Sequence, residues 1–253
     1  MPLCLRICSL ILLLAFAAAA RAAPLRLLTT DVQPLAFVVK GKLTGFCVEI
    51  VEEIQRRLGE PAAMEVLPWA RAYALAQTSQ NTLLVCPKRT REREALFQWV
   101  GPLLMADTYL YAKAGMATPL HSLADIKKLP NLLVIRESYA FHYLSSKGFE
   151  NLYLVNNASG MLQMLAANRA PAMVLETVQF DFVMCESGAP KIAIVPLMKL
   201  QSVSSNLAFS RDVPVRVVAQ WQATFDAMTH DGTYRTIYEK WFPSAAVHQR
   251  RQP

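Results

Sequence analysis

The feature that most constrains the fold is an alternation of strand-like and helix-like segments that continues along almost the whole chain. The first unit is a short apolar run, Leu25–Thr30, followed after a turn by an amphipathic stretch, Phe46–Leu58. In that stretch apolar residues recur at helical spacing, charged residues fill the opposite face, and Gly59 closes it. Such alternation favours an α/β fold with a largely parallel sheet.

The same reading applied to the rest of the chain gives two series of elements. The further predicted strands are Met64–Leu67, Thr82–Val85, Thr108–Ala112, Leu132–Ile135, Leu152–Leu154, Ala172–Leu175, Ala193–Val195 and Ser205–Phe209. The further predicted helices are Ala70–Gln77, Leu120–Lys127, Ala140–Ser146, Ala158–Ala167, Val213–Thr229 and Thr233–Trp241. A small, polar stretch at residues 113–119 separates the two series and indicates a passage between two lobes.

The N-terminus predicts export. Arg6 is followed by an apolar run, residues 7–20, and by the small-residue triplet Ala20-Arg21-Ala22, the layout of a cleaved signal peptide covering residues 1–22. The run is shorter than the roughly 20 apolar residues that a membrane-spanning helix needs. Without this segment the formal charge falls from +7 to +5, and no long basic run remains, so nucleic acid is not an expected partner.

Enzyme and metal motifs are absent from the sequence. It contains no His-Glu-x-x-His, no glycine-rich phosphate loop and no Gly-x-Ser-x-Gly elbow. The four histidines have no metal-ligand spacing among themselves or with the cysteines beyond the signal. We therefore expect no metal, no cofactor and no catalysis.

Four short motifs carry a resemblance to a known family. They are Gly41-Lys42-Leu43-Thr44-Gly45-Phe46, Pro68-Trp69, Thr90-Arg91-Glu92-Arg93, and Asp231-Gly232-Thr233-Tyr234 with Lys240-Trp241-Phe242. In this order, behind a signal peptide, they resemble the bacterial extracellular solute-binding proteins of family 3, which serve polar amino-acid ABC transporters. The resemblance runs from about Leu27 to Pro243.

The resemblance implies a type II periplasmic-binding-protein fold: two α/β lobes, the second inserted into the first, with two hinge crossings. The expected limits are residues 23–112 and 205–253 for lobe 1 and 113–204 for lobe 2, with crossings near residues 111–115 and 202–208. The ligand would lie between the lobes at the carboxyl ends of strands. The protein would be a periplasmic monomer that delivers a small amino-acid-like or carboxylate ligand to an ABC permease in the inner membrane.

Site residues follow from the resemblance, position by position. Arg93 matches the arginine that clamps the ligand's α-carboxylate, a task that suits a planar guanidinium, although it also lies in a run of charged residues. Glu176 matches the acid that accepts hydrogen bonds from the α-ammonium, or is a surface residue at a strand end. Trp69 matches a stacking aromatic, or is a core residue, and Arg71 could reach the same cleft.

Three more positions complete the set. Asp31 lies in the loop after the first strand, which faces the cleft in the family or forms an ordinary turn. Ser138 and Tyr139 begin a helix whose free N–H groups could bind a carboxylate, and Ser138 is also a good N-cap. Lys88 departs from the family's usual small hydroxyl residue and would suit a doubly anionic ligand, unless it points to solvent.

The resemblance also places Cys47 at the start of the first helix and Cys86 at the end of the third strand. Both positions are on the cleft side of lobe 1, so a disulfide between them is one alternative and two buried thiols are the other. Two other functions stay open: a secreted cyclohexadienyl dehydratase that uses Glu176 as general acid, and a sensor that reports ligand occupancy to a membrane receptor.

Overall fold

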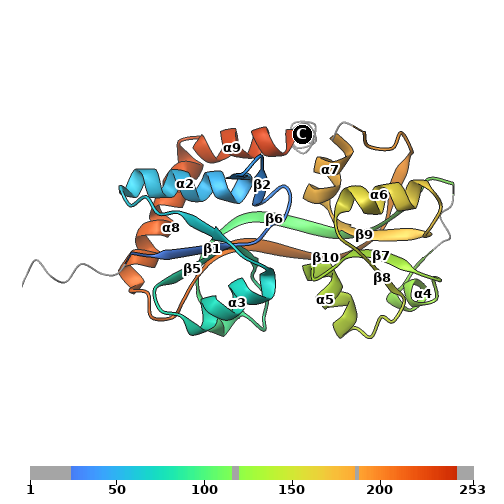
Figure 1. Ribbon diagram of the computed structural model, residues 1–253, viewed down its shortest axis with the longest axis horizontal. Helices are drawn as coiled ribbons and strands as arrows, with labels where there is room; N and C mark the ends of the chain where they lie inside the picture. The colour runs from blue at the N-terminus through green and yellow to red at the C-terminus, as the bar shows by residue number, and fades with distance from the viewer. Residues whose placement is uncertain (1–23, 116–119, 186–187, 244–253) are drawn as a thin grey trace, which may run out of the picture.

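The computed structural model describes residues 24–115, 120–185 and 188–243. Within them the protein has two α/β lobes that lie side by side, connected by long strands (Figure 1). The predicted signal peptide lies outside the described residues. Among those residues, no helix has the length and apolar character needed to cross a membrane.

A single 8-stranded sheet runs through both lobes, in the order β4-β1-β5-β10-β6-β9-β7-β8. Its strands are β1 Arg26–Thr29, β4 Met64–Val66, β5 Thr82–Lys88, β6 Gln98–Lys113, β7 Leu132–Ile135, β8 Leu152–Val155, β9 Ala172–Glu176 and β10 Ile194–Phe209. The outer strands of each lobe are parallel to one another, whereas β10 and β6 run antiparallel to each other and to their outer neighbours β5 and β9. The sheet is therefore mixed rather than largely parallel as predicted.

Helices cover both faces of the sheet in each lobe. Those of lobe 1 are α2 Phe46–Leu58, α3 Trp69–Thr78, α8 Val215–His230 and α9 Thr233–Trp241, and those of lobe 2 are α4 Leu123–Lys127, α5 Tyr139–Ser146, α6 Ala158–Ala166 and α7 Thr177–Cys185. In Figure 1, α2, α9, α6 and α7 lie above the sheet, and α3 and α5 lie below it. A short hairpin, β2 Phe37–Val39 with β3 Lys42–Thr44, precedes α2.

Helix α2 shows how the sequence sets these elements. Its apolar face, which includes Phe46, Ile50 and Ile54, is completely buried in the core of lobe 1. Gly59 ends the helix in the left-handed conformation, with φ of 72°, where glycine carries no steric penalty. Phe46 also packs against the C-terminal helix α9 through Tyr234 and Tyr238, so the end of the described chain returns to the first helix.

The two long strands are where the structure differs most from the prediction. Residues 193–195 and 205–209 were expected as two separate strands, but β10 is continuous between them. Strand β6 likewise begins at Gln98, ten residues before the expected start. Both strands pass from one lobe to the other, and their ends Lys113 and Ile194 pair with each other. The predicted limits of the lobes themselves stay a prediction.

Candidate functional site

Arg93 lies in the turn that follows β5, at the edge of lobe 1. Its guanidinium carbon is 4.8 Å from the ring centroid of Trp69 and 5.0 Å from that of Tyr73. The two rings belong to the first turns of α3 and stack on each other at 5.2 Å. The contact between the guanidinium and the two rings combines cation–π attraction with packing. Burial lowers the pKa of Arg93 below its usual value, and Tyr73 and Tyr139 oppose that shift. The structure thus brings Arg93 and Trp69 together.

The Arg93 guanidinium makes no ion pair with any carboxylate in the described part of the chain. Its Nη1 donates a hydrogen bond of 3.2 Å to the backbone oxygen of Lys88. Neighbouring Arg89, by contrast, holds Glu94 at 2.6 Å. A half-buried guanidinium that has no carboxylate bound to its N–H groups is suited to bind the carboxylate of a ligand.

Lys88 and Glu176 form an ion pair across the junction between the lobes. Lys88 ends β5 in lobe 1 and Glu176 ends β9 in lobe 2, and Lys88 Nζ donates to Glu176 Oε2 at 2.7 Å. Each side chain is only 9% exposed. Lys88 Nζ also donates to the hydroxyl of Ser205 on β10 at 3.1 Å. Lys88 therefore does not point to solvent, and Glu176 is not a surface residue.

The start of α5 brings a third group to the same place. The Tyr139 hydroxyl donates to Gln201 Oε1 on β10 at 3.3 Å. Burial raises the pKa of Tyr139, the charge of Arg93 opposes this shift, and the charges of Glu92 and Glu176 add to it. The Ser138 hydroxyl caps α5 by accepting the Phe141 N–H at 3.1 Å, which confirms the predicted N-cap.

Thr108 on β6 was not predicted as a site residue. It stands directly opposite Gln201 on one side and Glu176 on the other, so the three side chains form one row on one face of the sheet. Thr108 is completely buried, yet neither its Oγ1 nor Gln201 Nε2 has a hydrogen-bond partner among the described residues. A polar residue at a buried strand position was the signal that could have identified Thr108.

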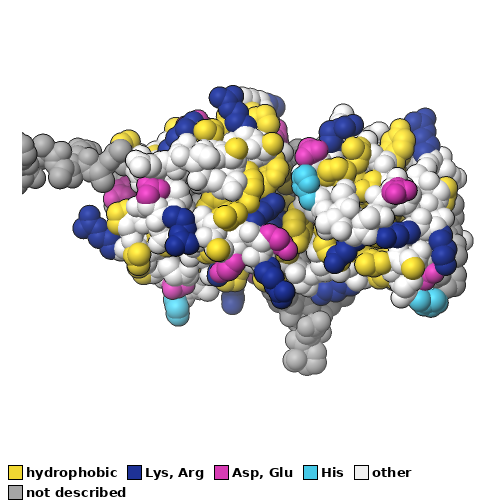
Figure 2. All heavy atoms as spheres, turned by 90° about the horizontal axis from the view of Figure 1, so that it is seen from below, with side chains coloured by type: hydrophobic (Ala, Val, Ile, Leu, Met, Phe, Trp, Pro, Cys, Tyr) yellow, Lys and Arg dark blue, Asp and Glu magenta, His cyan; other side chains and the backbone are white. Residues whose placement is uncertain are grey.

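Two further predicted residues are exposed. Arg71 is exposed on α3. The pKa of Glu65 on β4, the strand at the outer edge of the sheet, is lowered first by its hydrogen bond from Arg26, and the charge of Arg71 adds to that shift. Asp31 is exposed in the loop after β1. Figure 2 shows the molecule from the side of α3 and α5, with hydrophobic and charged side chains next to one another where the lobes meet.

A disulfide joins Cys47 of α2 to Cys86 of β5, with the Cα atoms 6.2 Å apart. Of the two alternatives that the sequence left open, the bridge is confirmed. It fixes the end of β5 against α2, two residues before Lys88. Lys88, the last residue of β5, and Arg93 therefore come shortly after a residue that is covalently bonded to α2.

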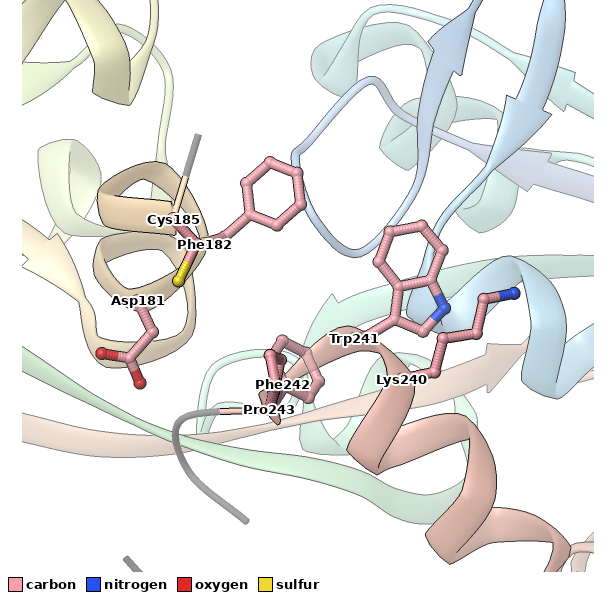
Figure 3. A pocket seen from close by; sticks show the side chains of 7 residues that line it. All are labelled: Asp181, Phe182, Cys185, Lys240, Trp241, Phe242 and Pro243. Carbon is pink, nitrogen blue, oxygen red and sulfur yellow. The ribbon is translucent and has the colours of Figure 1, made fainter. Parts of the chain in front are cut away.

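A cavity of about 250 Å³ lies on the other side of the sheet, between α7 of lobe 2 and α9 of lobe 1. Figure 3 shows its lining, with Phe182 and Trp241 on opposite walls. None of the predicted site residues lines it. In the part of the chain that the structure describes, no cluster of three or more His, Cys, Asp or Glu side chains could hold a metal ion.

Comparison with known proteins identifies the class. The sequence matches the bacterial extracellular solute-binding proteins, family 3, over residues 26–244, and the protein belongs to that family.

The chain also resembles individual proteins, at identities between 18% and 25%. The chain is 25% identical over 215 residues to a probable amino-acid-binding protein, YxeM of Bacillus subtilis strain 168, covering 83% of this chain and 80% of that protein. An ancestral arginine-binding protein bound to arginine superposes with a TM-score of 0.70 at 21% identity, over 87% of this chain and 99% of the other. A histidine kinase sensor domain that resembles periplasmic binding proteins superposes with a TM-score of 0.73 at 18% identity, over 86% and 95%. These structures share the two-lobed fold.

Proposed function

We propose that this protein captures a small, carboxylate-bearing, amino-acid-like metabolite between its two lobes, outside the cytoplasmic membrane, and delivers it to an ABC permease. Arg93 holds the carboxylate, Trp69 packs against the ligand, and Tyr139 with the N-terminus of α5 completes the site from lobe 2. The name of the Bacillus subtilis relative, a probable amino-acid-binding protein, supports a ligand of this size.

The observation that carries the proposal is the state of Arg93. Its guanidinium is partly desolvated against two aromatic rings, and no carboxylate of the described residues forms an ion pair with it, although the charge of Glu92 acts on it. A partly buried charge without an ion-pair partner is unfavourable, so the protein gains when a ligand supplies the opposite charge. Because Arg93 is in lobe 1 and Tyr139 in lobe 2, a ligand that contacts both also favours closure.

The disulfide supports an exported protein. Bridges of this kind persist in oxidising compartments such as the periplasm, and the predicted signal peptide would direct the chain there. Glu176 supports a protein that binds its ligand without reacting with it. A dehydratase would need this residue as its general acid. Glu176 Oε2 accepts a hydrogen bond from Lys88, so this oxygen is already engaged within the protein.

A thermal-shift screen of amino acids, hydroxy acids, dicarboxylates and short peptides tests the proposal, because a ligand that binds only the folded state raises the melting temperature. We expect a carboxylate-bearing compound to stabilise the wild type and to lose that effect with Arg93→Ala. Arg89→Ala, four residues earlier in the same turn and paired with Glu94, is the matched control and should respond as the wild type does. Stabilisation by uncharged compounds alone, or an unchanged response of Arg93→Ala, contradicts the proposal. Formation of aromatic product from prephenate or arogenate would show an enzyme instead.

A further inference from the structure

We propose that Lys88 takes the place of the ligand's ammonium at Glu176, so that the site selects carboxylates whose α-substituent is uncharged, such as 2-hydroxy acids, over the corresponding amino acids. This inference rests on the proposed function, since it takes Arg93 as the carboxylate clamp. It concerns the second subsite, where the family resemblance assigns Glu176 to an α-ammonium.

The ion pair already satisfies Glu176 with a cation. Lys88 Nζ lies 2.7 Å from Glu176 Oε2, at the distance expected for an ammonium bound to a carboxylate, and Ser205 holds the same Nζ from another side. Both side chains are about nine-tenths buried. To release Glu176 for a ligand, Lys88 would have to become a buried ammonium without its counter-charge, which is strongly unfavourable.

Binding beside Lys88 is no easier for an ammonium. A cation on the other oxygen of Glu176 would stand within one carboxylate's width of Lys88 Nζ. Like charges at that separation repel each other strongly where water is largely excluded. Glu176 therefore offers little net attraction for a second cation.

The neighbouring strand positions offer hydrogen bonds without charge. Thr108 Oγ1 and Gln201 Nε2 have no partner among the described residues, and both belong to the row of side chains that includes Glu176. A hydroxyl or keto oxygen can exchange hydrogen bonds with such groups, and a buried polar atom gains most from acquiring a partner. An ammonium could use the Thr108 hydroxyl but not the Gln201 N–H.

Titration calorimetry with matched ligand pairs tests this preference. The probes are L-malate against L-aspartate, 2-hydroxyglutarate against L-glutamate, L-lactate against L-alanine, and phenyllactate against L-phenylalanine. In the pair that binds best to the wild type, we expect the hydroxy acid to bind about tenfold tighter or more, a factor equivalent to about 1.4 kcal/mol. Lys88→Met keeps the length of the side chain but frees Glu176, and should shift the ratio by about tenfold or more toward the amino acid.

The double variant Lys88→Met/Glu176→Gln is the control, because it removes both charges and should lack the shift toward the amino acid. If Lys88→Met alone does not fold, the wild-type ratio and the double variant still decide. An amino acid that binds the wild type tighter than its hydroxy acid, with binding lost in Arg93→Ala, overturns this inference and leaves the proposed function standing. Binding that is unaffected by Arg93→Ala, or no binding of any probe, overturns both.

Discussion

Removal of the Cys47–Cys86 bridge should destabilise the protein by an amount that follows from the loop it closes. The two cysteines are 39 residues apart in sequence. For a loop of this length the chain-entropy relation gives about 4 kcal/mol of stabilisation at 25 °C, from the restriction of the unfolded chain. A chain of this size loses roughly 2–4 °C in melting temperature per kcal/mol, so the double variant Cys47→Ala/Cys86→Ala should melt roughly 8–16 °C lower. Alanine is the appropriate replacement, because Cys47 is completely buried and a serine there would bury an extra hydroxyl.

Thermal unfolding followed by circular dichroism measures this effect. The wild type in reducing agent should melt at about the temperature of the double variant, and reducing agent should leave the double variant unchanged. Cys185→Ala is the control, since Cys185 is exposed on α7 and outside the bridge, and it should melt close to the wild type. A decrease of less than about 2 °C in the double variant would refute the entropic reasoning. Alkylation of all three cysteines in unreduced mature protein would refute the bridge itself.

Three further predictions concern stability. Lys88→Ala should reduce the free energy of unfolding by about 3–5 kcal/mol in urea titrations, because it leaves the Glu176 carboxylate buried and unpaired, and Lys88→Met/Glu176→Gln should lose clearly less. The pKa of Glu53 is lowered from 4.5 to about 2, first by its hydrogen bond to Arg56. Its contribution is therefore present above about pH 4.5 and lost as the pH falls toward about 2, so Glu53→Gln should flatten the stability profile in that window; an unchanged profile contradicts the assignment. Gly45→Ala should lower the melting temperature, by the equivalent of about 2 kcal/mol or more, because Gly45 has φ of 133° and a Cβ there would meet the backbone of Leu35; a melting temperature equal to the wild type refutes this.

Local patterns in the sequence predicted many elements closely. Phe46–Leu58, Leu132–Ile135 and Thr233–Trp241 were expected with the limits that the structure shows. Each has either a clear amphipathic period or a short apolar run bounded by turn residues. Such signals depend on residues close together in the chain, and they indicate an element regardless of its partners.

The missed elements depend on tertiary contacts. Helix α7, Thr177–Cys185, has apolar residues on all sides and no dominant face, so its sequence gave no helical period. Strand β10 contains Pro196 and a polar stretch at residues 201–206, which look like a break between two strands. Its continuity comes from pairing with β6 along almost the whole length, a partner far away in sequence.

For the site, the sequence could name residues but not their partners. The prediction for Lys88 left a doubly anionic ligand and a solvent-exposed side chain as alternatives, and the structure shows a buried lysine paired with Glu176. That pairing joins two strand ends 88 residues apart, which no local pattern reports. Thr108 was missed for the same reason, because its place between Gln201 and Glu176 depends on strand register.

A crystal structure of the protein with its most stabilising carboxylate tests the central claim most directly. We expect the ligand between the lobes, with its carboxylate oxygens about 2.7–2.9 Å from the Arg93 guanidinium. The Lys88–Glu176 ion pair should be intact, with an uncharged part of the ligand beside Thr108 and Gln201. A carboxylate bound away from Arg93, for example in the cavity between α7 and α9, would contradict the account.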